Sequence, residues 1–160
     1  MAATAVAGAR TRADALKAPA EHPPNCLTAF SGLIGSGKTT AAHKLKEQKP
    51  TAWLISRDEI RRSVFSGPGL FSEEEDTITA IMLCLGKLGL MAGFDVIIDD
   101  LNIFPDEKQR WNALATELGV PIRWRCIVTD VEECVRRDAT RPHPVGREVI
   151  EQYAAAAGLP

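Results

Sequence analysis

One run of eight residues, from Gly32 to Thr39, constrains what this chain can fold into more than any other feature. It reads G-L-I-G-S-G-K-T and matches the phosphate-binding pattern G-x-x-x-x-G-K-[ST] at every fixed position. An apolar segment, Leu27 to Phe30, precedes the run, and a helical pattern from Lys38 to Gln48 follows it. Such a loop binds phosphate in this context, because a helix N-terminus points its free N–H groups toward phosphate oxygens.

Each position of the loop has a predicted role. Glycines allow close backbone approach to the phosphates, Lys38 is expected to contact the β- and γ-phosphates, and the Thr39 hydroxyl to bind Mg²⁺. A glycine-rich turn without function is the alternative, which the flanking strand and helix disfavour. The sequence therefore predicts ATP and Mg²⁺ as cofactors, with a nucleotide-binding set of Gly32, Leu33, Ile34, Gly35, Ser36, Gly37, Lys38, Thr39 and Thr40.

Composition narrows the class of protein. The 160 residues suit a single domain, and 45% apolar with 25% charged residues is typical of a soluble globular protein. No apolar run reaches the roughly 20 residues that cross a bilayer. The net charge of −2 argues against a broad basic face for nucleic acid. The four cysteines show no metal-binding or disulfide spacing, so we expect mostly buried, reduced thiols in a cytoplasmic protein.

The order of apolar segments predicts the fold. Residues 1–24 are interpreted as a flexible leader and 25–160 as one domain. Strands are expected at about 26–31, 51–56, 94–99 and 121–128, with amphipathic helices between them. This alternation predicts an α/β fold, a parallel sheet with helices on both faces.

Three helical patterns support that interpretation. One predicted buried stripe contains Ile78, Ile81, Met82, Leu85 and Leu88, and a second contains Trp111, Leu114, Ala115 and Leu118. The second helix should begin near Pro105 and end before Gly119. Asp130 and Glu133 have the spacing of a capping box at the start of a further helix.

A charged segment follows the second predicted strand. If Asp58 opens a helix, Arg61 lies one turn away on the same face, at the strand end where α/β folds bind ligands. Asp58 is then placed to accept a proton from an acceptor hydroxyl, and Arg61 to hold an anionic group. The alternative is a helix cap followed by solvated arginines.

Two further clusters belong to the same interpretation. Asp100, at the end of the third strand, is the chosen Mg²⁺ partner, although the run Asp99 to Asn102 also has the composition of a simple turn. Arg136, Arg137 and Arg141 lie at a helix end and in the proline-containing loop after it, as expected for a phosphate lid. A dipole-matched helix end explains Arg136 and Arg137 almost as well, but not Arg141.

The ordered motifs resemble the kinase domain of phage-type 5′-polynucleotide kinases. They are G-L-I-G-S-G-K-T, S-R-D-E-I-R, V-I-I-D-D-L-N, W-N-A-L-A-T-E-L-G, V-R-R-D-A-T-R and V-G-R-E-V-I, and they extend from about Thr28 to Tyr153. The resemblance implies a P-loop kinase fold and transfer of the γ-phosphate to a 5′-hydroxyl of a nucleic acid.

Site roles follow from the resemblance position by position. It implies that Asp58 is the general base, that Arg61 binds the phosphate next to the acceptor hydroxyl, and that Asp100 supports the metal and acceptor site. Arg141 would be the lid arginine on the donor phosphates, with Arg137 as a companion. The implied catalytic set is Lys38, Asp58, Arg61 and Arg141.

The acceptor stays open at this level. Related small kinases act on nucleosides, sugars or antibiotics, and phage kinases of 5-hydroxymethyluracil in DNA resemble this group too. A P-loop ATPase module is the third alternative, disfavoured because Leu101 replaces the water-activating Glu that usually follows the strand-end aspartate. The sequence does not indicate an oligomeric state.

Overall fold

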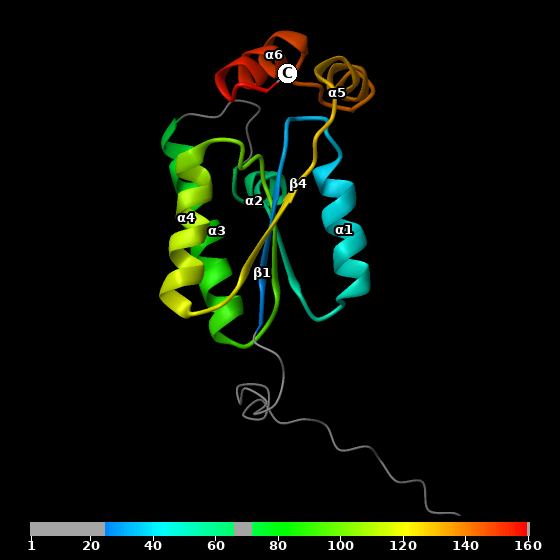
Figure 1. The fold of residues 1–160 in the computed structure, drawn as a ribbon. Helices are drawn as coiled ribbons and strands as arrows, with labels where there is room; N and C mark the ends of the chain where they lie inside the picture. Colours follow the sequence, from blue (N-terminus) through cyan, green and yellow to red (C-terminus); the bar gives the residue numbers. More distant parts are fainter. Residues whose placement is uncertain (1–24, 66–71, 160) are drawn as a thin grey trace, which may run out of the picture.

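The computed structural model describes residues 25–65 and 72–159, and in them a parallel sheet forms the centre of the molecule. The predicted leader, residues 1–24, lies outside the described residues. The sheet has four strands in the order β2-β3-β1-β4, and every neighbouring pair is parallel (Figure 1). The strands are β1 (Leu27–Ser31), β2 (Trp53–Ser56), β3 (Val96–Asp99) and β4 (Ile122–Cys126).

Helices cover both faces of this sheet and its carboxyl end. Helix α1 (Lys38–Gln48) packs on one face, and α3 (Ser72–Met91) with α4 (Pro105–Leu118) packs on the other (Figure 1). Helix α2 (Arg57–Val64) follows β2 directly, while α5 (Val131–Asp138) and α6 (Arg147–Ala156) lie beyond the carboxyl ends of the strands. The predicted α/β fold with helices on both faces is confirmed.

The two central strands are apolar on both sides because both sides are covered. On the α3 and α4 side the core includes Leu27 of β1 and Ile98 of β3, and on the α1 side it includes Phe30 and Ile97. These four side chains have at most 1% exposure. Such burial explains why neither strand alternates regularly between apolar and polar residues, although β1 also buries Thr28 and Ser31.

The predicted apolar stripe of α3 is wrong at its C-terminal end. Ile78 and Met82 are completely buried, but Leu88 is 52% exposed. Glycine takes the inward position there: a Cβ on Gly89 would lie 2.9 Å from a methyl group of Val96. The helix therefore approaches the sheet through a residue without a side chain, and Leu88 turns toward solvent.

Two smaller predictions also need correction. Asp130 accepts a hydrogen bond from the backbone N–H of Glu132 at 2.9 Å, but Glu133 pairs with the arginines that follow it rather than completing a capping box. Of the cysteines, only Cys26 and Cys134 are buried, because Cys84 and Cys126 lie on solvent-facing sides of α3 and of the edge strand β4. The predicted limits of α4 are confirmed, with Pro105 at its first position and Gly119 in a left-handed conformation after its end.

Asn102 ties the end of β3 to β1 and is fully buried, with a φ of 46°. Its Nδ2 donates to the carbonyl oxygen of Phe30 at 2.8 Å, its Oδ1 accepts from Trp111 Nε1 at 3.2 Å, and its own carbonyl accepts from Ser31 Oγ at 2.7 Å. Ser31 immediately precedes the phosphate-binding loop. Asn102 therefore holds the two strand ends from which the site is built.

We expect Asn102→Ala to lower the free energy of unfolding by about 3 kcal/mol, because it leaves a buried carbonyl and a buried indole N–H without partners. Denaturant titration measures this loss. Asn112→Ala is the matched control: its side chain also accepts from a tryptophan N–H, of Trp124 at 3.0 Å, but at the exposed surface. The control substitution should lower the free energy of unfolding by no more than about 0.5 kcal/mol. Equal losses in the two variants would contradict the role of Asn102 in holding the two strand ends together.

Candidate active site

The loop between β1 and α1 is shaped by glycines that no other residue can replace. A Cβ on Gly32 would lie 2.5 Å from the carbonyl oxygen of Ile127, and a Cβ on Gly35 would lie 2.5 Å from that of Cys134. Gly35 also has a φ of 82°, in the left-handed region. The backbone thus packs closely against the residue after β4 and the middle of α5, in a loop whose N–H groups can turn toward phosphate.

Two polar side chains of this loop are buried in a way that fits a polyphosphate. Lys38 is 8% exposed, and its Nζ donates to the carbonyl oxygen of Leu33 at 2.8 Å. Burial lowers the pKa of Lys38 to about 8, although the nearby Asp99 and Asp100 act in the opposite direction. The Ser36 Oγ is buried with no hydrogen-bond partner among the described residues. A triphosphate would compensate both groups, so the loop fits the nucleotide that its sequence predicts.

The low pKa of Lys38 makes nucleotide binding depend on pH. In the free protein Lys38 loses its proton as pH rises through about 8, whereas a bound polyphosphate favours the charged form and raises the pKa. ATP affinity should therefore fall between pH 7 and pH 9.5, and binding at pH 8.5 should take up a proton. Calorimetry in buffers of different ionisation enthalpy measures that uptake. The proton uptake should vanish in Lys38→Met. An equal uptake in that variant would show that another group takes up the proton when the nucleotide binds.

Two aspartates lie at the end of β3 next to the loop. Asp99 accepts hydrogen bonds from Thr39 and Ser56, and burial raises its pKa. Asp100 instead accepts from Arg57 Nε and from the Leu101 N–H, both at 2.8 Å. Asp100 stays our predicted Mg²⁺ partner, and Asp99 joins it as a candidate because of its contact with Thr39. Mg²⁺ retains several waters and binds phosphate oxygens, so these few protein oxygens suit it.

Helix α2 carries the residues that the sequence predicts for the acceptor side. Asp58 and Arg61 form an ion pair one turn apart, as their spacing predicts. Arg61 also pairs with Glu75 of α3 at 2.8 Å, and Arg57 pairs with the same Glu75 at 2.8 Å. Sequence reasoning missed Arg57 and Glu75. Arg57 directly precedes Asp58 in the quoted motif, so the sequence could have identified it as a site residue. Glu75 lies in an acidic run whose composition is typical of a solvated helix start.

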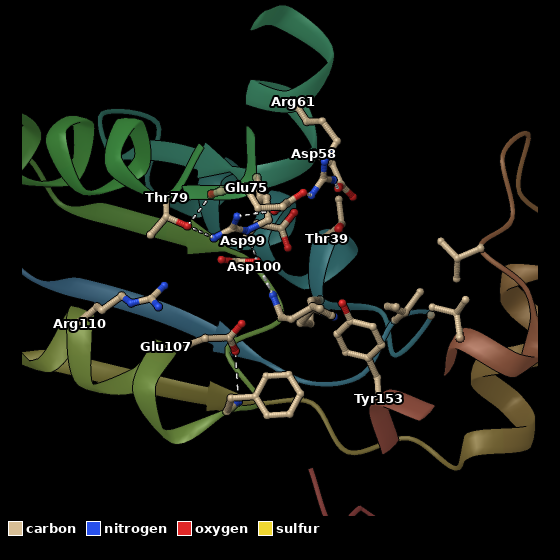
Figure 2. A pocket seen from close by; sticks show the side chains of 18 of the residues that line it. Thr39, Asp58, Arg61, Glu75, Thr79, Asp99, Asp100, Glu107, Arg110 and Tyr153 are labelled. Carbon is tan, nitrogen blue, oxygen red and sulfur yellow. Dashed lines mark hydrogen bonds and ion pairs between the residues drawn. The ribbon is translucent and has the colours of Figure 1, made fainter. Parts of the chain in front are cut away.

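One cleft of about 590 Å³ joins the loop to α2. The predicted donor and acceptor residues all line this cleft, namely Lys38, Thr39, Asp58, Arg61 and Arg141. Figure 2 shows Thr39 close to Asp58 and Arg61. The opposite wall consists of residues that the sequence did not identify as part of a site. They come from α4 and α6 and from the residue before α4, and include Phe104, Glu107, Arg110, Val149 and Tyr153.

The predicted lid arginines differ in their surroundings. Arg141 lines the cleft, and its Nη1 lies 3.8 Å from Oδ1 of the buried Asp138. Arg137 donates to the carbonyl oxygen of Ser36 at 3.2 Å, which places its guanidinium beside the phosphate-binding loop. Arg136 is bound to Glu133 on the surface. The structure thus brings Arg141 and Arg137 to the loop and leaves Arg136 outside the site.

The fold and this loop together define a domain with the P-loop kinase fold. Residues 27–160 match the family model described as AAA domain, and the chain belongs to this family of P-loop domains. None of the helices in the described residues is long and apolar enough to span a bilayer.

Some known proteins are similar to this chain in sequence and others in structure. The chain is 30% identical over 113 residues to the Bifunctional enzyme NodQ of Rhizobium meliloti (strain 1021), a match that covers 68% of this chain and 17% of that enzyme. The structure of the present chain is similar to that of a chain in the Pnkp1/Rnl/Hen1 RNA repair complex, with a TM-score of 0.74 and 24% identity. The match covers 87% of this chain and 46% of that chain. The Mycobacterium tuberculosis APS kinase CysC, in complex with AMPPNP and APS, gives a TM-score of 0.61 with 19% identity, covering 87% and 78%. The chain thus spans less than half the length of the first two.

Proposed function

We propose that this protein is an ATP-dependent phosphotransferase that moves the γ-phosphate of ATP to a hydroxyl of a nucleic acid, in the manner of 5′-polynucleotide kinases. One observation carries the proposal: Lys38 of the phosphate-binding loop and Asp58 of α2 line the same cleft. A hydrolytic ATPase usually activates water with a Glu directly after the strand-end aspartate, where this chain has Leu101. A kinase needs a carboxylate to orient an organic hydroxyl.

The proposed chemistry assigns each side chain a task. Asp58 accepts the proton of the acceptor hydroxyl as its oxygen bonds to the γ-phosphorus, while the bond from that phosphorus to the ADP oxygen breaks. Lys38 and Arg141 stabilise the negative charge on the transferring group. When bound, Mg²⁺ neutralises phosphate charge, and Thr39 with Asp99 or Asp100 would hold it. Arg61 holds the acceptor.

Three observations support a nucleic-acid acceptor. The motif order is similar to that of polynucleotide kinases, and a chain of the RNA repair complex that contains Pnkp1 has a similar fold. The wall of the cleft opposite α2 also carries two aromatic rings, of Phe104 and Tyr153, whose centroids lie 6.0 Å apart. Aromatic rings in a binding cleft suit nucleobases, which stack on them without sequence preference.

A small-molecule acceptor is the second candidate, favoured by the charge of the same cleft. Six carboxylates line it beside five cationic side chains, and the carboxylates are those of Asp58, Glu75, Asp76, Asp99, Asp100 and Glu107. A cleft without a clear positive charge disfavours a long polyanion. The APS kinase with a similar fold was determined in complex with APS, which agrees with the second candidate function.

Transfer of labelled γ-phosphate to a panel of acceptors tests the proposal. The panel contains 5′-hydroxyl DNA and RNA oligonucleotides, DNA with 5-hydroxymethyluracil, nucleosides, sugars and adenylyl sulfate. Label on the 5′ ends is the expected result. Label on small molecules alone would select the second candidate, and free phosphate without any labelled acceptor would indicate an ATPase.

A further inference from the structure

Glu75 lies between two guanidinium groups at the acceptor side of the cleft. Its Oε2 accepts from Arg57 Nη1 at 2.8 Å. Its Oε1 accepts from Arg61 Nη2 at 2.8 Å, and both Glu75 and Arg61 are labelled in Figure 2. Arg57 and Arg61 are four residues apart on α2, so one face of the helix presents both. Each arginine also has a private carboxylate, Asp100 for Arg57 and Asp58 for Arg61. Among the described residues, Glu75 is the partner that the two arginines share.

This arrangement reproduces the way arginines bind phosphate. Two oxygens of one anionic group each accept from a different guanidinium, as two oxygens of a phosphate ester do. The Arg57 Nε is occupied by Asp100 and its Nη2 by Thr79 Oγ1 at 3.0 Å, which leaves Nη1 as the terminal nitrogen that only Glu75 occupies. An anionic ligand that binds the two arginines through these same terminal nitrogens takes the place of the Glu75 carboxylate.

We propose that Glu75 occupies the site of an anionic group of the acceptor and is displaced when that group binds. The inference rests on the proposed function, because it places this group beside the hydroxyl that faces Asp58. The phosphate subsite itself is what the resemblance implies for Arg61, and the inference adds Glu75 as the group that occupies this subsite until the acceptor binds. An acceptor with a phosphate ester next to the reacting hydroxyl has to compete with Glu75, whereas a neutral acceptor leaves Glu75 in place. Glu75 is therefore a specificity-determining residue that lowers the affinity for anionic acceptors.

Binding of inorganic phosphate tests the site without turnover. The protein is loaded with Mg²⁺ and a non-hydrolysable ATP analogue, so that the donor site is filled, and phosphate is titrated by calorimetry. Glu75→Gln keeps the size of the side chain and removes its charge, and should bind phosphate about tenfold more tightly than the wild type. Adding Arg61→Ala to Glu75→Gln should abolish the gain. Glu59→Gln removes an equal charge from the solvent-exposed side of α2 and should change nothing.

Two dinucleotides then test the acceptor class. One has an ordinary phosphodiester next to the 5′-hydroxyl, and the other has an uncharged methylphosphonate there. In Glu75→Gln the KM of the diester should fall about tenfold and that of the methylphosphonate should stay within about twofold. A structural role of Glu75 in holding the arginines would instead raise both KM values. Glu75→Ala repeats the test if the glutamine variant unfolds.

The outcomes separate the two proposals. Unchanged or weaker phosphate binding in Glu75→Gln overturns the role of Glu75, whatever the acceptor is. Tighter phosphate binding with no phosphorylation of either dinucleotide leaves the anion site standing and overturns the nucleic-acid acceptor.

Discussion

Lys38→Met should lower kcat/KM for phosphoryl transfer at least about a thousandfold without destabilising the fold. In the proposed function the ammonium group is the cation that the phosphate-binding loop supplies to the transferring phosphoryl group, and methionine keeps most of the side-chain volume while removing the charge. Burial holds the pKa of Lys38 at about 8, below its ordinary value. At pH 7 the folded protein therefore retains a charged group that burial disfavours, and stability linked to this group rises as pH rises past 8.

The sign of that linkage gives a second measurement on the same variant. Because the methionine carries no charge to bury, the melting temperature at pH 7 should be equal to or above that of the wild type. Lys44→Met is the matched control, since Lys44 is an exposed lysine of the same helix and should change neither activity nor stability. A variant with normal turnover, or one that loses activity only by unfolding, would refute the role of Lys38.

Much of this fold was predictable because local sequence and tertiary environment agree. The central strands are buried on both faces and are mostly apolar. The loop after β1 is fixed by glycines whose missing Cβ atoms leave room for Ile127 and for Cys134 of α5. The Asp58 and Arg61 pair was predictable for a similar reason. Both residues belong to one short helix, so their spacing alone places them on one face.

The missed features depend on contacts between distant segments. Glu75 accepts a hydrogen bond from Arg57, which lies 18 positions away in the sequence. The rings of Phe104 and Tyr153 lie close together although they belong to distant segments. Asn102 looked like a turn former, and only the fold reveals that it is a buried clamp between two strands and Trp111. The exposure of Leu88 has the same origin, because the glycines of α3 decide which side of the helix approaches the sheet.

Asp58→Asn should leave nucleotide affinity within about twofold of the wild type and lower kcat by about a hundredfold to ten-thousandfold. Asparagine keeps the shape of the side chain and can still accept a hydrogen bond, but it cannot take the proton of the acceptor hydroxyl. The carboxylate is 63% exposed at the mouth of the cleft, so its loss should not affect the core. Calorimetry with a non-hydrolysable ATP analogue measures the first quantity, and single-turnover transfer of labelled phosphate measures the second.

The partner of Asp58 makes a control on the same helix necessary. Asp58→Asn also removes the carboxylate that pairs with Arg61, so a lower affinity for the acceptor would also reduce the observed rate of transfer. The two effects separate kinetically, since a lower affinity raises the acceptor KM and saturation restores the rate, whereas a missing base lowers kcat at saturation. Glu59→Gln, at the neighbouring exposed position, should retain full activity. If Asp58→Asn reached more than a tenth of the wild-type kcat at saturating acceptor, another group would have to accept the proton, and the catalytic assignment of α2 would fail.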